Sequence, residues 1–131
     1  MLYAYLAALG AFIVVDAVFL TLVMRPIFES HIGGMLRASP DWLAAAVFYL
    51  AYTAGVLWFA IMPGVAAGSV MKAAGTGVLL GAMAYGAYEL TNMATLNNWS
   101  WRMVAADTAW GAFLTGLVAF VGAFVALRNA A

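Results

Sequence analysis

The sequence contains no cysteine, one histidine and few charged residues, and each scarcity excludes a class of protein. Without cysteine the chain has no disulfides, no thiolate metal sites and no quinone-linked thiol chemistry. The lone histidine, His31, has no partner at metal-ligand spacing, so we expect no metal site, no haem and no other cofactor. Only 8% of the 131 residues are charged, whereas a soluble domain has about 25%. A water-facing surface cannot be built from so few charges.

Signatures of common enzymes and of nucleic-acid-binding proteins are also missing. The sequence has no nucleotide-binding loop, no G-x-S-x-G elbow and no H-E-x-x-H motif. Its formal net charge is zero, so it has no basic excess with which to bind nucleic acid. These absences remove the common enzyme classes without excluding every enzyme.

Long apolar segments dominate the chain, of which 68% is hydrophobic. Four such segments, each near the ~20 residues that one bilayer crossing needs, cover residues 2–24, 42–62, 71–93 and 102–127. They are continuously apolar, whereas the strands of a membrane barrel alternate apolar and polar side chains. The sequence therefore predicts an all-α protein, an integral membrane four-helix bundle with short loops, in which residues 1–131 form a single transmembrane domain.

The connections between these segments predict how the helices begin and end. The segment 25–41 contains Pro26, so we expect the first helix to end near Met24 and a short interfacial helix to cover residues 27–32. With four crossings, this segment and the connection 94–101 lie on one side of the membrane, which we call the loop face. This face has three arginines, and the other side has Lys72, Arg128 and the N-terminal amine, so the positive charges do not decide the orientation.

Tryptophans mark the ends of the apolar segments. Trp42, Trp99 and Trp101 all lie at such ends, where an aromatic belt at the membrane surface is expected.

Three of the five acidic residues lie inside apolar segments, namely Asp16, Glu89 and Asp107. An acid at the centre of a membrane helix costs about 3 kcal/mol on insertion scales, so three of them indicate a structural or functional role. Counted along antiparallel helices at 1.5 Å per residue, all three lie roughly 6 to 12 Å below the loop face. We therefore expect them to form one layer and to point into the bundle.

Other polar and aromatic residues fall at the same level. On the third segment they follow the i, i+3, i+4, i+7 spacing of one helical face, and the second and fourth segments add more. The predicted pocket or proton site comprises Asp16, Tyr49, Tyr52, Tyr85, Tyr88, Glu89, Asn92, Asp107 and Trp110. Below it, Gly77 and Gly81 form a small-xxx-small seam that lets two helices approach closely.

The polar layer has two interpretations. The acids can be protonated and hydrogen-bonded, so that they hold the helices together without any further role. Alternatively, they mark a path for protons or cations. A carboxyl group removed from water favours its neutral form, so at least one of Asp16, Glu89 and Asp107 is predicted to be protonated near neutral pH.

Several short motifs resemble a known family. They are Phe19-Leu20 after Asp16, Phe48-Tyr49 before Gly55, Met62-Pro63, the run Y-G-A-Y-E-L-T-N over residues 85–92, and D-T-A-W-G over residues 107–111. Together they resemble, over nearly the whole chain, the bacterial predicted membrane proteins of domain-of-unknown-function family 2177. The family's usual acid in the 85–92 run is Asp, where this sequence has Glu89. The resemblance implies a four-helix, multi-pass protein of the bacterial inner membrane and supplies no activity.

Three functions remain open from the sequence. The first is proton- or cation-linked binding or transport of a small amphiphilic substrate. The expected partners are that substrate, the surrounding membrane lipids and a second copy of the chain in a homodimer. The second is a membrane-embedded enzyme acting on a lipid or isoprenoid, with two carboxyl groups as acid and base. The third is an accessory subunit of a membrane complex, whose polar layer only fixes the helix register.

Overall fold

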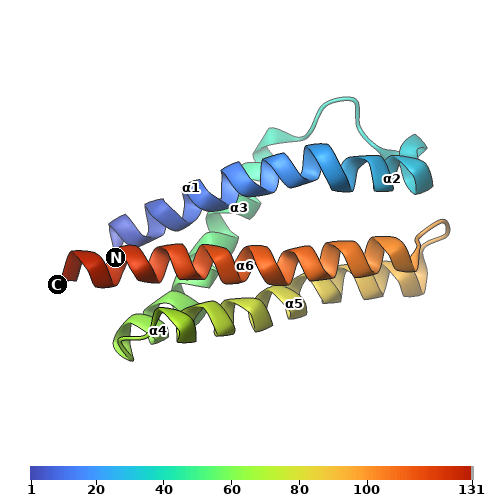
Figure 1. Cartoon of the computed structure of the whole chain (residues 1–131). Helices are drawn as coiled ribbons and strands as arrows, with labels where there is room; N and C mark the ends of the chain where they lie inside the picture. Colours follow the sequence, from blue (N-terminus) through green and yellow to red (C-terminus); the bar gives the residue numbers. More distant parts are fainter. Residues whose placement is uncertain (131) are drawn as a thin grey trace.

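The computed structural model describes residues 1–130, which form four long helical rods and, within that range, no strand (Figure 1). The first rod joins α1 (Leu2–Phe19), the π-helical turn η1 (Leu20–Met24), α2 (Arg25–Ile32) and the 3-10 turn η2 (Gly33–Met35). The second joins α3 (Trp42–Val56), the π-helical turn η3 (Leu57–Ile61) and α4 (Met62–Ala66). The third and fourth are α5 (Val70–Thr95) and α6 (Trp101–Ala130). The predicted all-α membrane bundle is confirmed.

Three of the rods are long and apolar enough to cross a membrane: Leu2–Met35, Trp42–Ala66 and Trp101–Asn129. α5 is long enough at 26 residues, but its glycines and its polar side chains make it less apolar than the others. The fourth crossing therefore stays a prediction. Both termini and the α4–α5 connection lie at one end of the molecule, and α2 and the α5–α6 connection lie at the other (Figure 1).

The first rod does not stop at Met24, where the sequence predicts its end. It continues through η1 into α2, which includes residues 27–32, where the sequence predicts a short helix; its interfacial position stays a prediction. Pro26 has no backbone N–H, and its ring would clash with the carbonyl group four residues back in a regular helix. The wider π turn directly before it removes this conflict, and η3 occupies the same position before Pro63. Both prolines are thus tolerated inside continuous rods.

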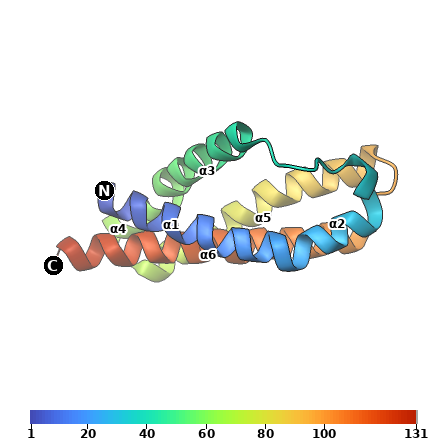
Figure 2. The same ribbon diagram turned by 90° about the horizontal axis from the view of Figure 1, so that it is seen from above.

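Packing is uneven around the bundle. α5 packs most extensively against α6, and α1 packs against the other side of α6. α3 contacts α1 more than α6, and in Figure 2 its N-terminal half lies apart from α6, with the connection from α2 running across to it. The bundle is therefore tight along α5 and α6 and looser beside α3.

Two apolar clusters fill the interior at different depths. The larger lies toward the termini and includes Phe12, Ile61 and Leu114. The smaller lies at the loop face, where Trp99 and Met103 meet the apolar side of α2. Along each helix the buried acids fall between the two clusters. The polar layer therefore separates two apolar cores.

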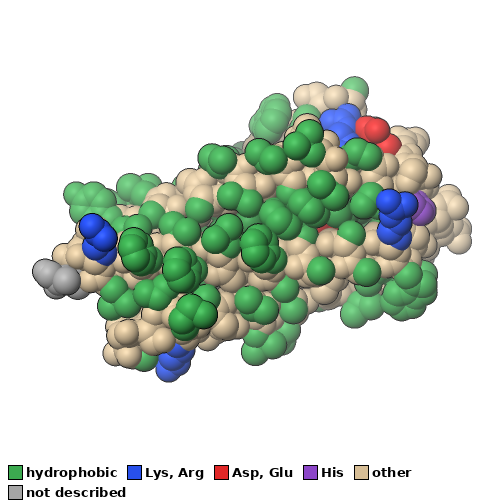
Figure 3. All heavy atoms as spheres, viewed as in Figure 1, with side chains coloured by type: hydrophobic (Ala, Val, Ile, Leu, Met, Phe, Trp, Pro, Cys, Tyr) green, Lys and Arg blue, Asp and Glu red, His purple; other side chains and the backbone are tan. Residues whose placement is uncertain are grey.

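The outer surface is that of a membrane protein. On the face seen in Figure 3, hydrophobic side chains are spread along the length of the molecule, and the charged side chains lie near its two ends. Large apolar residues such as Val14, Trp58 and Met83 are exposed on three different rods. Exposed apolar surface on this scale is stable only in contact with lipid.

Candidate functional site

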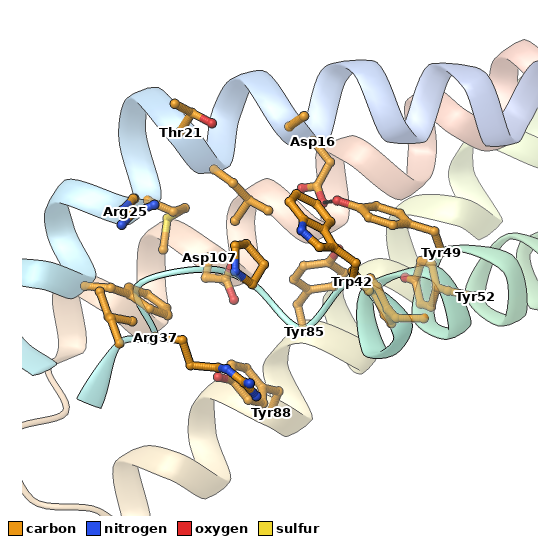
Figure 4. A pocket seen from close by; sticks show the side chains of 18 of the residues that line it. Asp16, Thr21, Arg25, Arg37, Trp42, Tyr49, Tyr52, Tyr85, Tyr88 and Asp107 are labelled. Atoms are coloured by element: carbon orange, nitrogen blue, oxygen red, sulfur yellow. Dashed lines mark hydrogen bonds between the residues drawn. The ribbon is translucent and has the colours of Figure 1, made fainter. Parts of the chain in front are cut away.

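A cavity of about 950 Å³ opens between α1, α3, α5 and α6 at the level of the polar layer (Figure 4). Its walls are mostly apolar and include Leu20, Met24, Phe28 and Phe48. Six of the nine predicted site residues line it, namely Asp16, Tyr49, Tyr52, Tyr85, Tyr88 and Asp107. The other three, Glu89, Asn92 and Trp110, do not line the cavity.

All three membrane acids are buried, as the sequence predicts. Asp16 is 5% exposed, Asp107 is 7% exposed and Glu89 has no exposed surface. They come from α1, α6 and α5, so the layer joins three of the four rods. What differs between them is the set of groups around each carboxyl.

Asp16 is held by two neutral donors. The Tyr49 hydroxyl on α3 donates to Asp16 Oδ2 at 2.8 Å, and Trp110 Nε1 on α6 donates to Asp16 Oδ1 at 3.2 Å. Phe19 stacks on the Trp110 indole with ring centroids 3.8 Å apart, which fixes its orientation. Hydrogen bonds of this kind orient a carboxyl group and favour its charged form without supplying a counter-charge.

Aromatic side chains form the floor of the cavity on the side of the termini. The fully buried ring of Phe12 packs edge-on against Tyr49 and Tyr52, at centroid distances of 4.9 and 5.5 Å. The Tyr52 hydroxyl shares a hydrogen bond of 2.8 Å with Thr115 Oγ1 on α6. Packed aromatic rings therefore bound the cavity on the side of the termini.

Tyr85 lies flat against α6 because residue 111 is glycine. A Cβ atom at Gly111 would stand only 2.1 Å from Tyr85 Cγ, so any other residue would displace the ring. Within residues 1–130, no group forms a hydrogen bond with the Tyr85 hydroxyl. This hydroxyl is thus free to bond a molecule in the cavity.

Glu89 lies behind the cavity wall. Its Oε1 accepts a hydrogen bond of 3.1 Å from Trp99 Nε1, whereas its buried Oε2 has no donor among the described residues. The carboxyl group of Asp107 lies within hydrogen-bonding reach of Glu89 and faces the cavity. The two acids are therefore neighbours, with one inside the wall and one on its surface.

Trp99 differs from the expected belt residue. It is only 8% exposed, whereas Trp42 and Trp101 are 71% and 65% exposed, as a belt requires. The left-handed conformation of Asn98, at φ 65°, turns the chain after α5 and directs Trp99 back into the bundle. The Asn97-Asn98 pair is the feature of the sequence that could have predicted this turn, because asparagine tolerates the left-handed conformation better than most residues.

The basic residues of the cavity rim are already paired. Arg25 Nε lies 2.8 Å from Glu29 Oε1, and Arg37 Nη1 lies 3.7 Å from Asp41 Oδ2. In both pairs the acid follows the arginine by four residues. In the described part of the chain, no salt bridge reaches Asp16, Glu89 or Asp107. The buried acids thus lack a cationic partner.

No metal site accompanies these acids. Residues 1–130 contain no group of three or more His, Asp or Glu side chains that could hold a metal ion. His31 lies on α2 away from the cavity lining, where its Nδ1 is 2.8 Å from the Ile27 carbonyl oxygen.

Comparison with known proteins identifies the family but not an activity. The model of the family described as "Predicted membrane protein (DUF2177)" matches residues 1–124, so the chain belongs to this family and is a membrane protein. Neither a curated protein nor a solved structure matches the chain.

Proposed function

We propose that this member of the DUF2177 family binds a small amphiphilic cation in the cavity and exchanges it for a proton. One observation carries the proposal: Asp16 and Asp107 face a largely apolar cavity without a salt bridge to any described basic residue. A buried carboxylate without a counter-charge is costly, and either a proton or a cationic ligand removes that cost. The two can therefore compete for the same layer.

The cavity walls suit a ligand with an apolar body. A volume of about 950 Å³ is near the upper end of the usual range for small-molecule sites, about 300 to 1,000 Å³. Tyr49, Tyr52 and Tyr85 line the cavity beside Asp16, and aromatic faces attract cations. An amphiphile can also reach the site from the surrounding lipid, which a hydrophilic ion cannot do.

Binding is tested with tetraphenylphosphonium, an apolar aromatic cation, added to the protein in detergent. We expect titration calorimetry in buffers of different ionisation enthalpy to show binding together with proton release. Asp16→Asn should weaken binding about tenfold or more, which is about 1.4 kcal/mol. Asp41→Asn is the matched control, because Asp41 is exposed outside the cavity. Equal affinity in wild type and Asp16→Asn would contradict the proposal.

Transport is tested in proteoliposomes. We place the exchange in the bacterial inner membrane, across which a proton gradient is maintained. An imposed pH gradient should drive uptake of the probe by the wild type and not by Asp16→Asn. Binding without uptake would restrict the protein to a binding role.

A second function, an enzyme acting on a lipid or isoprenoid, is favoured by the unequal surroundings of two cavity acids. Asp16 accepts hydrogen bonds from Tyr49 and Trp110, whereas Asp107 has only another acid in reach. Unequal surroundings can divide the acid and base roles between two carboxyl groups. Mass spectrometry of lipids from cells expressing wild type or Asp107→Asn tests this function. An enzyme requires a lipid that is chemically altered in cells expressing the wild type and unaltered in cells expressing Asp107→Asn.

A further inference from the structure

The position of Glu89 is not explained by a ligand in the cavity. Its side chain is fully buried and does not line the cavity, so a ligand there does not touch it. Only one of its two carboxyl oxygens has a hydrogen-bond donor, Trp99 Nε1. Burying a polar atom without a hydrogen bond costs about 1 to 3 kcal/mol in proteins. A donor for Oε2 is therefore required.

We propose that Glu89 and Asp107 share one proton and that this pair is the proton-binding site of the protein, separate from Asp16. The two carboxyl groups belong to α5 and α6, the most closely packed helices, and lie within hydrogen-bonding reach. A proton on Asp107 lets Asp107 donate to Oε2, and a proton on Oε2 lets Glu89 donate to Asp107, so in both cases Oε2 gains a hydrogen-bond partner. A protonated acid donates one strong hydrogen bond to an ionised one, which neither can do when both are charged.

The groups around the pair favour a single shared proton. Trp99 faces it from the α5–α6 connection, Tyr85 and Tyr88 lie nearby on α5, and Asp16 faces Asp107 from α1. None of these groups is cationic. Arg25 and Arg37 line the same cavity as Asp107 but pair with Glu29 and Asp41, and no salt bridge reaches either acid in the described chain. Two carboxylates in contact, removed from water and without a counter-charge, do not both ionise.

The geometry also gives the proton a way out. Asp107 is 7% exposed and lines the cavity, whereas Glu89 is fully enclosed, so the proton leaves through Asp107. A cation bound at Asp16 would repel that proton and favour its release. This last step alone rests on the proposed function, and the shared proton does not.

The shared proton is tested without any ligand by infrared spectroscopy, in which a protonated carboxyl group has a separate carbonyl band. At pH 7 exposed acids, with pKa values near 4, are ionised and give no such band. We expect the band in wild type and the same band in the matched control Glu29→Gln. In Asp16→Asn a band should remain, and in Glu89→Gln the band should become weaker or shift, because the shared proton is gone. Glu89→Asp keeps both carboxyl groups and should retain a band.

Labelling adds a test on the native cavity. Glu29 and Glu89 are the only glutamates, so carboxyl-labelled glutamate in Glu29→Gln protein reports on Glu89 alone. The label should shift the band if Glu89 shares the proton. An absent band at pH 7, or a band that neither the label nor Glu89→Gln alters, would overturn the inference.

The same variants separate this inference from the proposed function. A Glu89-dependent band in a protein that does not bind tetraphenylphosphonium supports the shared proton and rejects the cationic ligand. Binding by a protein without the band rejects the shared proton and leaves the ligand in place. With both correct, wild type releases a proton on binding the probe and Glu89→Gln releases none.

Discussion

Replacing Gly81 by alanine tests whether α5 and α6 are as close as the structure shows. A Cβ atom at Gly81 would stand 2.2 Å from the Gly111 carbonyl oxygen and 2.6 Å from Thr115 Oγ1. Ordinary van der Waals contact begins near 3.4 Å, so the backbones have to separate by about 1.2 Å at this point. A carbonyl oxygen of a helix cannot rotate away as a flexible side chain can.

The expected cost follows from that displacement. A gap of 0.5 to 1 Å already forfeits a quarter to a half of a dispersion contact, and overpacking typically costs about 1 to 3 kcal/mol. We expect Gly81→Ala to lower the free energy of unfolding by about 2 to 3 kcal/mol. Gly75→Ala on the same helix is the matched control, because its Cβ meets nothing within 4 Å. There alanine should be neutral or stabilise by up to about 1 kcal/mol.

The assay is reversible unfolding in dodecyl maltoside with increasing dodecyl sulfate, followed by circular dichroism. Both variants replace glycine by alanine in α5, so the effect of helix propensity on the free energy of unfolding is the same in both. The difference between the two variants therefore measures the contact between α5 and α6. If Gly81→Ala and Gly75→Ala differ by less than about 0.5 kcal/mol, the close approach of α5 to α6 at Gly81 is refuted.

Three other substitutions give expected outcomes in the same unfolding assay. Tyr49→Phe removes a donor from Asp16 and should cost about 1 kcal/mol, within the range measured for hydrogen bonds in membranes. Trp99→Phe leaves the buried Oε1 of Glu89 without its donor and should cost about 1 to 3 kcal/mol. Asp41 caps α3 by accepting from the Ala44 N–H, so Asp41→Ala should cost about 1 kcal/mol, whereas Asp41→Asn should be nearly neutral.

The fold was largely predictable from the sequence because lipid imposes few choices. Continuous apolar runs of sufficient length predict helices, and short connections make successive helices antiparallel. What the sequence did not predict is the continuation of the first rod past Met24. Proline usually ends a helix, and nothing in the local sequence shows that a π turn, η1, absorbs the misfit at Pro26.

The candidate site was predictable as a layer but not as a set of contacts. Helical periodicity places Tyr85 and Glu89 on one face of α5, yet the first lines the cavity and the second lies behind it. Which of the two residues lines the cavity depends on where α6 and Trp99 pack against α5. The periodicity of one helix does not predict its contacts with other helices. The pairing of Glu89 with Asp107 likewise depends on the spacing of α5 and α6, which Gly77 and Gly81 permit.

The length of the first rod relates the protein to the thickness of its membrane. Its apolar part, α1 followed by η1, contains 18 and 5 residues and is about 35 Å long, whereas the hydrocarbon core of a bilayer is about 30 Å. Hydrophobic mismatch of this kind is relieved by tilting, and the tilt decreases as the lipid chains become longer. Asp16 and Met24 on this rod form one wall of the cavity, and α3 forms the opposite wall. We therefore expect the acyl-chain length of the surrounding lipid to change the width of the cavity.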